Sequence, residues 1–117
     1  MDPIFDRVGG VCAWLHQGVI YSFRGEPLAY VRAEWVISYR GRYLGQLING
    51  YFQDRHGASV AWMFGAAGGP TTPVPALPPN PPGLQELPPF PVVGVQPVSP
   101  VASLVWSRSS WDGFVGG

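Results

Sequence analysis

Glycine recurs every sixteen residues through the first half of this chain, and the residues around each glycine recur with it. Read from three residues before the glycine, the four segments are DRVGGVCAWL, SFRGEPLAYV, SYRGRYLGQL and DRHGASVAWM. Each has Asp or Ser first, and each ends with an apolar, a small, an aromatic and an aliphatic residue. Gln46 is the one departure at the aromatic position. A fixed period over four copies indicates a repeat architecture, marked by Gly9, Gly25, Gly41 and Gly57.

Each sixteen-residue unit predicts two strands and two tight turns. The repeat glycine is the second residue of a two-residue x-Gly loop such as Arg24-Gly25, which is a strong hairpin signal. A type I′ loop requires φ > 0, so we expect positive φ at all four glycines. The result is an eight-strand antiparallel meander over residues 1–66, with a second set of turns midway between the glycines at Gln17-Gly18, Ala33-Glu34 and Asn49-Gly50.

Alternation along these strands predicts two apolar faces, because successive side chains point to opposite sides. The second face is compact and aliphatic and carries only small residues at one repeated position: Ala13, Ala29, Gly45 and Ala61. We therefore expect four β-hairpins that converge on a pseudo-fourfold axis. The first face is aromatic-rich and collects Phe5, Cys12, Trp14, Val19, Tyr21, Phe23, Leu28, Tyr30, Trp35, Ile37, Tyr39, Leu44, Tyr51, Val60 and Trp62.

The rest of the chain has a different composition. Twelve of the fourteen prolines lie between Pro70 and Pro100, so residues 67–102 are expected to form a Pro-rich arm in the polyproline II conformation. Residues 103–117 are rich in Trp and Ser and are interpreted as either a ninth strand or a docking segment. On this division the core belongs to residues 1–66, and the last third of the chain lies outside it.

The first seven residues (MDPIFDR), the third unit (SYRGRYLG), the Pro-rich tail and the C-terminal WSRSSWDGF together give the chain a family resemblance. It resembles the four-fold beta flower family of small bacterial proteins over nearly its whole length. The resemblance implies the fold, four β-hairpins around an internal axis. It implies no activity and no catalytic residues.

Charge and composition exclude several classes of function. Seven arginines, no lysine and seven acidic residues give a net charge of zero, so nothing indicates binding to nucleic acid or to an anionic membrane. The single cysteine, Cys12, excludes an internal disulfide and a multi-cysteine metal site. No cofactor motif and no nucleophile–base pattern is present. With no visible signal peptide or long apolar stretch, the expected location is the cytoplasm.

Two polar patterns lie near the predicted hairpin tips. Asp6, Ser22, Ser38 and Asp54 share one repeat position, where they would either form a ring suited to a cation or a sugar, or fix each turn by bonding to backbone N–H groups. The second interpretation is preferred. A hydrolase using Asp6 and Asp54 is the least favoured alternative. Cationic side chains also gather at the tips, either as an anion-binding rim or as ordinary solvated surface: Arg7, Arg24, Arg40, Arg42, Arg55 and His56.

The aromatic face is the strongest candidate for a binding surface. Exposed, it would be a stacking platform for a sugar, a base or a Pro-rich peptide; covered, it would be a second core. We expect a non-catalytic interaction or structural module whose aromatic face packs its own Pro-rich tail, a neighbouring subunit or another polypeptide. A small-ligand module that binds a sugar-like molecule is the alternative. The residues assigned to the face are Trp14, Tyr30, Gln46, Trp62, Trp35 and Tyr51.

Overall fold

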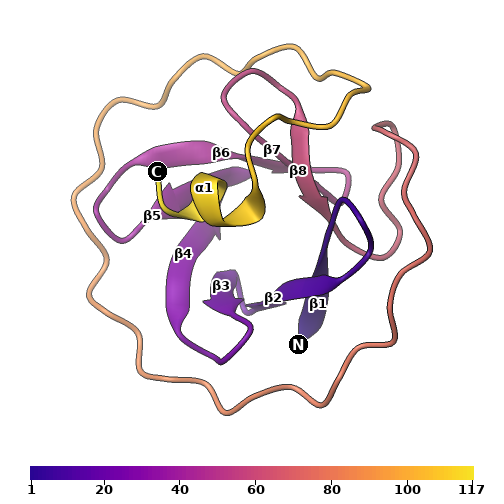
Figure 1. Cartoon of the computed structure of the whole chain (residues 1–117). Helices are drawn as coiled ribbons and strands as arrows, with labels where there is room; N and C mark the ends of the chain where they lie inside the picture. Colours follow the sequence, from indigo (N-terminus) through magenta and orange to yellow (C-terminus); the bar gives the residue numbers. More distant parts are fainter.

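Eight strands, paired in sequence order, close into one antiparallel barrel in the computed structural model, which describes residues 1–117 (Figure 1). The closing contact joins the first strand to the last, where Phe5 pairs with Trp62 and Asp6 with Ala61. The predicted all-β meander is therefore confirmed, with the two edge strands paired to each other. The strands are β1 (Asp2–Asp6), β2 (Val11–His16), β3 (Val19–Ser22), β4 (Pro27–Arg32), β5 (Trp35–Ser38), β6 (Tyr43–Ile48), β7 (Tyr51–Gln53) and β8 (Ser59–Trp62).

Two kinds of turn alternate around the barrel. The turns midway between the repeat glycines are two-residue loops with φ > 0 at both positions, as type I′ geometry requires. Gln17 and Gly18 have φ of 50° and 77°, and the Ala33-Glu34 and Asn49-Gly50 loops are alike. These turns match the sequence-based expectation, even where the loop contains no glycine.

The four hairpin tips were predicted to be type I′ as well, and that prediction is wrong. At the first tip the Gly9 N–H donates to Asp6 O (3.1 Å) and the Asp6 N–H donates to Gly10 O (2.9 Å), which closes a three-residue loop. Only the third loop residue, Gly9, has positive φ (93°), while Val8 does not. This is a type I turn followed by a left-handed glycine. The expected positive φ holds at all four repeat glycines, whereas the turn type does not.

A β-bulge follows each tip and reverses the alternation of side chains. In the first pair Phe5 faces Val11 and Ile4 faces Ala13, so Cys12 is the extra residue. Both Cys12 and Ala13 then pack inside the barrel. The assignment of the four bulged residues to the aromatic face is therefore wrong, because a bulge places two neighbouring residues on one side. The four residues are Cys12, Leu28, Leu44 and Val60.

The barrel interior is the main core, and its centre has room only for small side chains. Ala13, Ala29 and Ala61 are fully buried, and a Cβ on Gly45 would collide with the Gln53 carbonyl. The predicted convergence of four small residues is confirmed. The main core consists of Ile4, Ala13, Ile20, Ala29, Val36, Leu44, Phe52, Val60, Ala61, Trp111 and Phe114.

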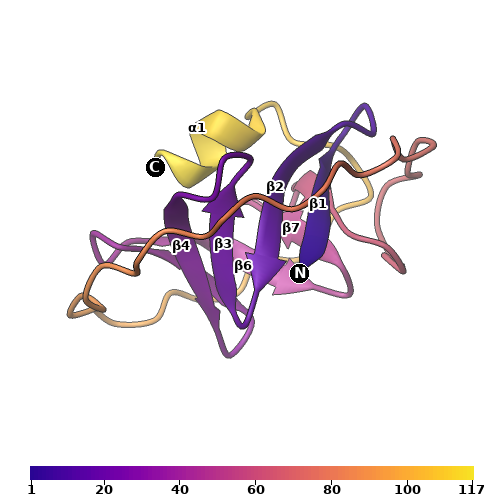
Figure 2. The same cartoon turned by 90° about the horizontal axis from the view of Figure 1, so that it is seen from below.

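One end of the barrel is closed by a short helix, α1 (Trp111–Val115), which lies over it in the side view (Figure 2). The Ser110 side chain caps the helix by accepting a hydrogen bond from the Gly113 N–H (3.1 Å), and Trp111 and Phe114 both enter the core. The expectation that the last third lies outside the core is therefore wrong. A ninth strand does not form either, since the segment makes only an isolated bridge between Ser59 and Trp106.

Candidate functional site

The aromatic-face residues lie on the outside of the barrel, and every one of them is buried. Trp14, Tyr30, Gln46, Trp62, Trp35 and Tyr51 are each at most 5% exposed. Residues 70–106, called the belt below, run around the perimeter of the barrel as the orange segment of Figure 1. In the side view the belt crosses the strands between the two barrel ends (Figure 2).

The structure divides the predicted residues between two clusters. Trp14, Tyr30 and Trp35 belong to one cluster, against which Leu84 and Val93 of the belt pack. Tyr51 and Trp62 join Phe5 in another, against which Trp106 packs. The face is thus a second apolar layer, shared by barrel and belt, and no single ring of stacked aromatics is formed.

Aromatic and cationic groups hold the belt at defined points. The Phe90 ring meets Tyr30 edge-on, with centroids 4.9 Å apart. The Arg32 guanidinium carbon lies 5.3 Å from the Tyr30 ring centroid and 5.7 Å from that of Phe90, which is a cation–π arrangement with both. At the start of the belt the Tyr51 hydroxyl donates to the Pro70 carbonyl.

The backbone of the belt is bonded to the hairpin tips at intervals of nine residues. The N–H groups of Ala76, Gln85 and Ser103 donate to the carbonyls of Gly9, Gly25 and Gly57, at 2.8 to 3.0 Å. The intervening position, Gly94, instead accepts from the Tyr43 hydroxyl at 3.3 Å. The belt backbone also lies close to the tip glycines. A Cβ on any of the four glycines would collide with a belt carbonyl, and these carbonyls are again nine residues apart: Val74, Gly83, Val92 and Val101.

The sequence carries a signal for this register, although the prediction of an arm outside the core did not use it. Pro-x-x-Pro recurs every nine residues, with its first proline at 70, 79, 88 and 97. Polyproline II has three residues per turn and a rise of about 3.1 Å, so nine residues make three turns and span about 28 Å. The molecule measures 37 × 35 Å across its two longer axes. A quarter of the perimeter of an ellipse with those axes is about 28 Å, the length of nine residues of polyproline II. One belt repeat therefore spans one barrel repeat.

The outward side of the belt carries an apolar ridge. Residues three apart lie on one side of a polyproline II helix, and those from Val92 to Leu104 are all aliphatic. The four valines of the ridge are 89 to 97% exposed. The belt is thus two-sided. The second proline of each of the first three Pro-x-x-Pro repeats lies against a tip glycine, and the opposite side carries the exposed ridge of Val92, Val95, Val98, Val101 and Leu104.

Gln46, which breaks the aromatic position of the repeat, marks a polar gap beneath the belt. It pairs with Trp35 and Gln53 across the sheet, and its amide nitrogen donates to the Ser99 hydroxyl (3.0 Å). The side-chain carbonyls of Gln46 and Gln53 are buried without a hydrogen-bond partner. Beside this gap lies a cavity of about 290 Å³, lined by Trp35, Tyr43, Asp54, Arg55, Val95, Pro97, Val98 and Pro100.

The Asp and Ser residues at the tips fix the turns, as preferred from the sequence. Asp54 accepts hydrogen bonds from the backbone N–H groups of His56 (2.8 Å) and Ala58 (3.1 Å), and the other three residues repeat this pattern. One oxygen of each side chain is thereby engaged by its own loop, and the second carboxylate oxygen of Asp54 accepts from the Ser107 hydroxyl. The structure holds no group of three or more His, Cys, Asp or Glu residues placed to bind a metal ion.

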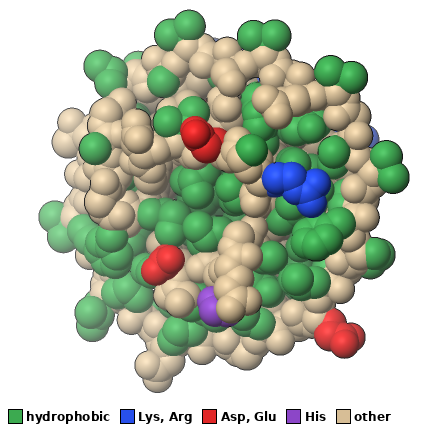
Figure 3. Space-filling model, turned by 180° about the vertical axis from the view of Figure 1, so that it is seen from behind, with side chains coloured by type: hydrophobic (Ala, Val, Ile, Leu, Met, Phe, Trp, Pro, Cys, Tyr) green, Lys and Arg blue, Asp and Glu red, His purple; other side chains and the backbone are tan.

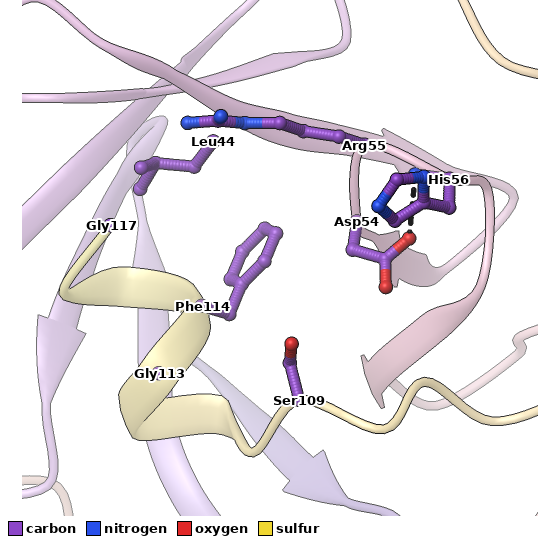
Figure 4. Close-up of a pocket in the computed structure, with 8 residues that line it drawn as sticks. All are labelled: Leu44, Asp54, Arg55, His56, Ser109, Gly113, Phe114 and Gly117. Atoms are coloured by element: carbon purple, nitrogen blue, oxygen red, sulfur yellow. Dashed lines mark hydrogen bonds between the residues drawn. The ribbon is translucent and has the colours of Figure 1, made fainter.

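A polar pocket of about 280 Å³ separates α1 from the β7–β8 tip (Figure 4). Leu44 and Phe114 form its apolar wall, and Arg55 extends across it. The Ser109 hydroxyl points into the pocket, but no hydrogen bond joins it to the His56 imidazole. The pocket offers hydrogen-bond donors and an apolar wall, without a paired nucleophile and base.

Cys12 is the only thiol of the chain, and its surroundings disfavour ionisation to the reactive thiolate. Burial, assisted by the negative charge of Asp6, raises the pKa of the Cys12 thiol far above its usual value of 9.0. The thiol donates to the Ile4 carbonyl at 3.4 Å. Because only the thiolate is a good nucleophile, Cys12 acts as a small apolar residue of the core.

Comparison with known proteins gives a family match that covers the barrel, the belt and α1. A family model described as 4-fold beta flower protein matches residues 2–115. Comparisons with curated proteins and with solved structures gave no significant match. No helix in the structure has the length and apolar character needed to cross a membrane.

Proposed function

Because this chain belongs to the 4-fold beta flower proteins, a family of uncharacterised function, we propose a function from its geometry: a non-catalytic polypeptide-binding module whose aromatic face holds a Pro-rich segment. In the free protein that segment is its own tail, residues 67–117. The observation that carries this proposal is the register between the nine-residue belt repeat and the sixteen-residue barrel repeat.

The contacts resemble those of a bound peptide. The belt supplies prolines, a few apolar side chains and regularly spaced backbone amides, and the barrel supplies aromatic rings and tip carbonyls. Pro-rich segments suit aromatic surfaces because polyproline II is already stiff, so little conformational entropy is lost on docking. The same features favour exchange with a Pro-rich segment of another polypeptide that has nine-residue spacing.

The chain between barrel and belt is built to be an exposed connection. Gly65 and Gly68 both have positive φ, and a Cβ at either would meet no atom within 4 Å. A protease recognition sequence inserted between Ala67 and Gly68 would therefore allow the folded chain to be cut without disturbing the belt contacts. The cut separates the barrel from its tail while leaving both present.

The test is whether the cut tail behaves as a ligand. We expect the two pieces to stay together at micromolar concentration, and a fluorescent peptide of residues 68–117 to replace the cut tail in a saturable manner. A control peptide with one extra alanine after Pro79 and another after Pro88 has nearly the same composition but loses the nine-residue spacing. It should bind at least about tenfold more weakly, since its backbone N–H groups can bond to fewer of the tip carbonyls at the same time. Equal binding of the two peptides contradicts the proposal.

A small-ligand site beside Gln46 is the second candidate function. The cavity near Gln46 has two aromatic walls, Trp35 and Tyr43, and the polar side chains of Asp54 and Arg55. A sugar-like molecule would bring an apolar ring face for the aromatic walls and hydroxyl groups for the polar ones. The test is titration of methyl glycosides while the Trp35 indole N–H resonance is followed by NMR. Saturable shifts that disappear in Tyr43→Leu, which removes the other aromatic wall and keeps the Trp35 probe, support this site, and the absence of any shift at millimolar glycoside excludes it.

A further inference from the structure

The two ends of the barrel are closed in different ways. At one end Trp111 and Phe114 of α1 cover the apolar bulge residues. At the other end a second ring of apolar side chains, again sixteen residues apart, is only half-buried: Leu15, Val31, Leu47 and Met63. We call the surface around this ring the open face.

The open face is broad and largely apolar. Figure 3 shows it from the side opposite α1, with an apolar centre surrounded by acidic, basic and histidine side chains. Phe64, two residues beyond the end of β8, is 59% exposed, and Met1 is 38% exposed. Apolar area that a monomer leaves uncovered in one continuous patch is typical of an interaction surface.

A protruding side chain and a hollow lie next to each other on this face. The hollow has a volume of about 300 Å³ and is lined by Asp2, Pro3, Leu47, Gly50, Met63 and Phe64. Phe64 is therefore both part of the wall of the hollow and one of the most exposed aromatic residues of the chain. A twofold axis passing close to Phe64 would place the Phe64 ring of each copy in the hollow of the other. This knob-beside-hole arrangement is what an isologous contact needs.

The size and charge of the open face suit a second copy of the chain. The molecule is a disc of 37 × 35 × 21 Å, and an ellipse with the two longer axes has an area of about 1,000 Å², compared with about 800 Å² per partner in a standard interface. The net charge is zero, and charges of both signs surround the face, so electrostatic repulsion does not oppose self-association.

We infer that the open face is the interface of a symmetric homodimer, in which two discs stack with their helices outward and each Phe64 inserts into the hollow of the other copy. This interface lies on the barrel end, away from the belt contacts, and does not depend on the polypeptide-binding function proposed above. Its occupant is a second copy of this chain.

Sedimentation equilibrium of the full chain tests the inference. The wild type is expected to be a dimer at tens of micromolar, and Phe64→Asp should raise the dimer Kd by about tenfold or more, as for the loss of an interface hot spot. Phe23→Asp is the matched control, because Phe23 is similarly exposed (48%) but lies at a hairpin tip; it should leave the Kd unchanged. Val98→Ser reports on the exposed belt ridge and should also leave it unchanged.

A second measurement does not rely on the folding of a variant. In a mixture of isotope-labelled and unlabelled chains, intermolecular nuclear Overhauser effects are expected between the Met63 methyl group of one copy and the Phe64 ring of the other. A wild type that stays monomeric at several hundred micromolar overturns the inference. A dimer that is abolished by Val98→Ser and unaffected by Phe64→Asp overturns it as well, by placing the contact on the belt.

Discussion

The backbone N–H of Gln85 donates to the carbonyl oxygen of Gly25 at 3.0 Å, across sixty residues of sequence. Gly25 is the tip of the second hairpin, and Gln85 belongs to the second belt repeat. The same bond joins the first tip to Ala76 and the fourth tip to Ser103. The sixteen-residue repeat of the barrel is thereby matched to the nine-residue repeat of the belt.

Gly25→Ala should destabilise the protein by about 2 kcal/mol or more. The residue has φ of 95°, which strains any residue with a Cβ, and the new methyl group would also collide with the Gly83 carbonyl. Gly18→Ala is the matched control: its φ is 77°, but its Cβ would meet only Val31 O at 3.6 Å, so the loss should be about 1 kcal/mol. Urea unfolding measures both. Equal losses would mean that the belt does not press on the tip.

Ala29→Leu should overpack the barrel axis and lower the unfolding free energy by about 1–3 kcal/mol. Ala29 is fully buried among the four small residues that meet there. Ala76→Leu adds the same atoms at an exposed belt position and should be nearly neutral. Thermal unfolding of the two variants compares them directly, and a neutral Ala29→Leu would contradict the convergence of the four repeats.

Removing the cap or the aromatic residues of α1 should weaken closure of the barrel end by different amounts. Ser110→Ala removes the acceptor for the Gly113 N–H, at a loss of about 1 kcal/mol. Trp111→Ala removes a core side chain, at a loss of about 3–5 kcal/mol. Urea unfolding, with near-ultraviolet circular dichroism to follow the tryptophan, separates the two. A Trp111→Ala loss no larger than that of Ser110→Ala would show that the helix does not belong to the core.

The stability of the protein should fall in alkali because of Cys12. Its pKa is raised in the folded state, so the folded chain keeps the neutral thiol while the unfolded chain ionises above its ordinary pKa. Stability is therefore complete below about pH 9 and falls above it by about 1.4 kcal/mol per pH unit for one group. Cys12→Ala should reduce the slope of unfolding free energy against pH by about 1.4 kcal/mol per pH unit, the contribution of one proton. Burial also raises the pKa of Tyr39, but Tyr39 is present in both proteins and cancels in the comparison.

Features that depend on a few neighbouring residues could be predicted from the sequence. The strands and the Gln17-Gly18 class of turns follow from spacing, and the burial of Ala29 follows from the repeated small side chain. The bulges could not be placed, because Cys12 turns inward only if the tip loop has three residues, and Asp6-x-x-Gly9 is compatible with two loop lengths. The aromatic site residues were correctly assigned to one face, but their division into two clusters depends on belt residues far away in the sequence.

The position of the tail around the barrel could not be predicted from its composition. The proline content of the tail predicts an arm outside the core, because proline cannot join a strand ladder or a helix interior. The nine-residue spacing of Pro-x-x-Pro is visible in the sequence, but its meaning depends on the perimeter of a barrel that is known only once the strands close. The single helical turn around Trp111 is too short for a periodicity signal.

Hydrogen exchange of the belt amides tests the central claim, that the belt is held in register by the hairpin tips. A free polyproline II segment has no internal hydrogen bonds and exchanges at random-coil rates. We predict that the N–H groups of Ala76, Gln85 and Ser103 exchange at least about a hundredfold more slowly than those of their neighbours Leu77, Glu86 and Leu104, because only the first three are bonded to tip glycines. Random-coil exchange at all six positions would contradict the account.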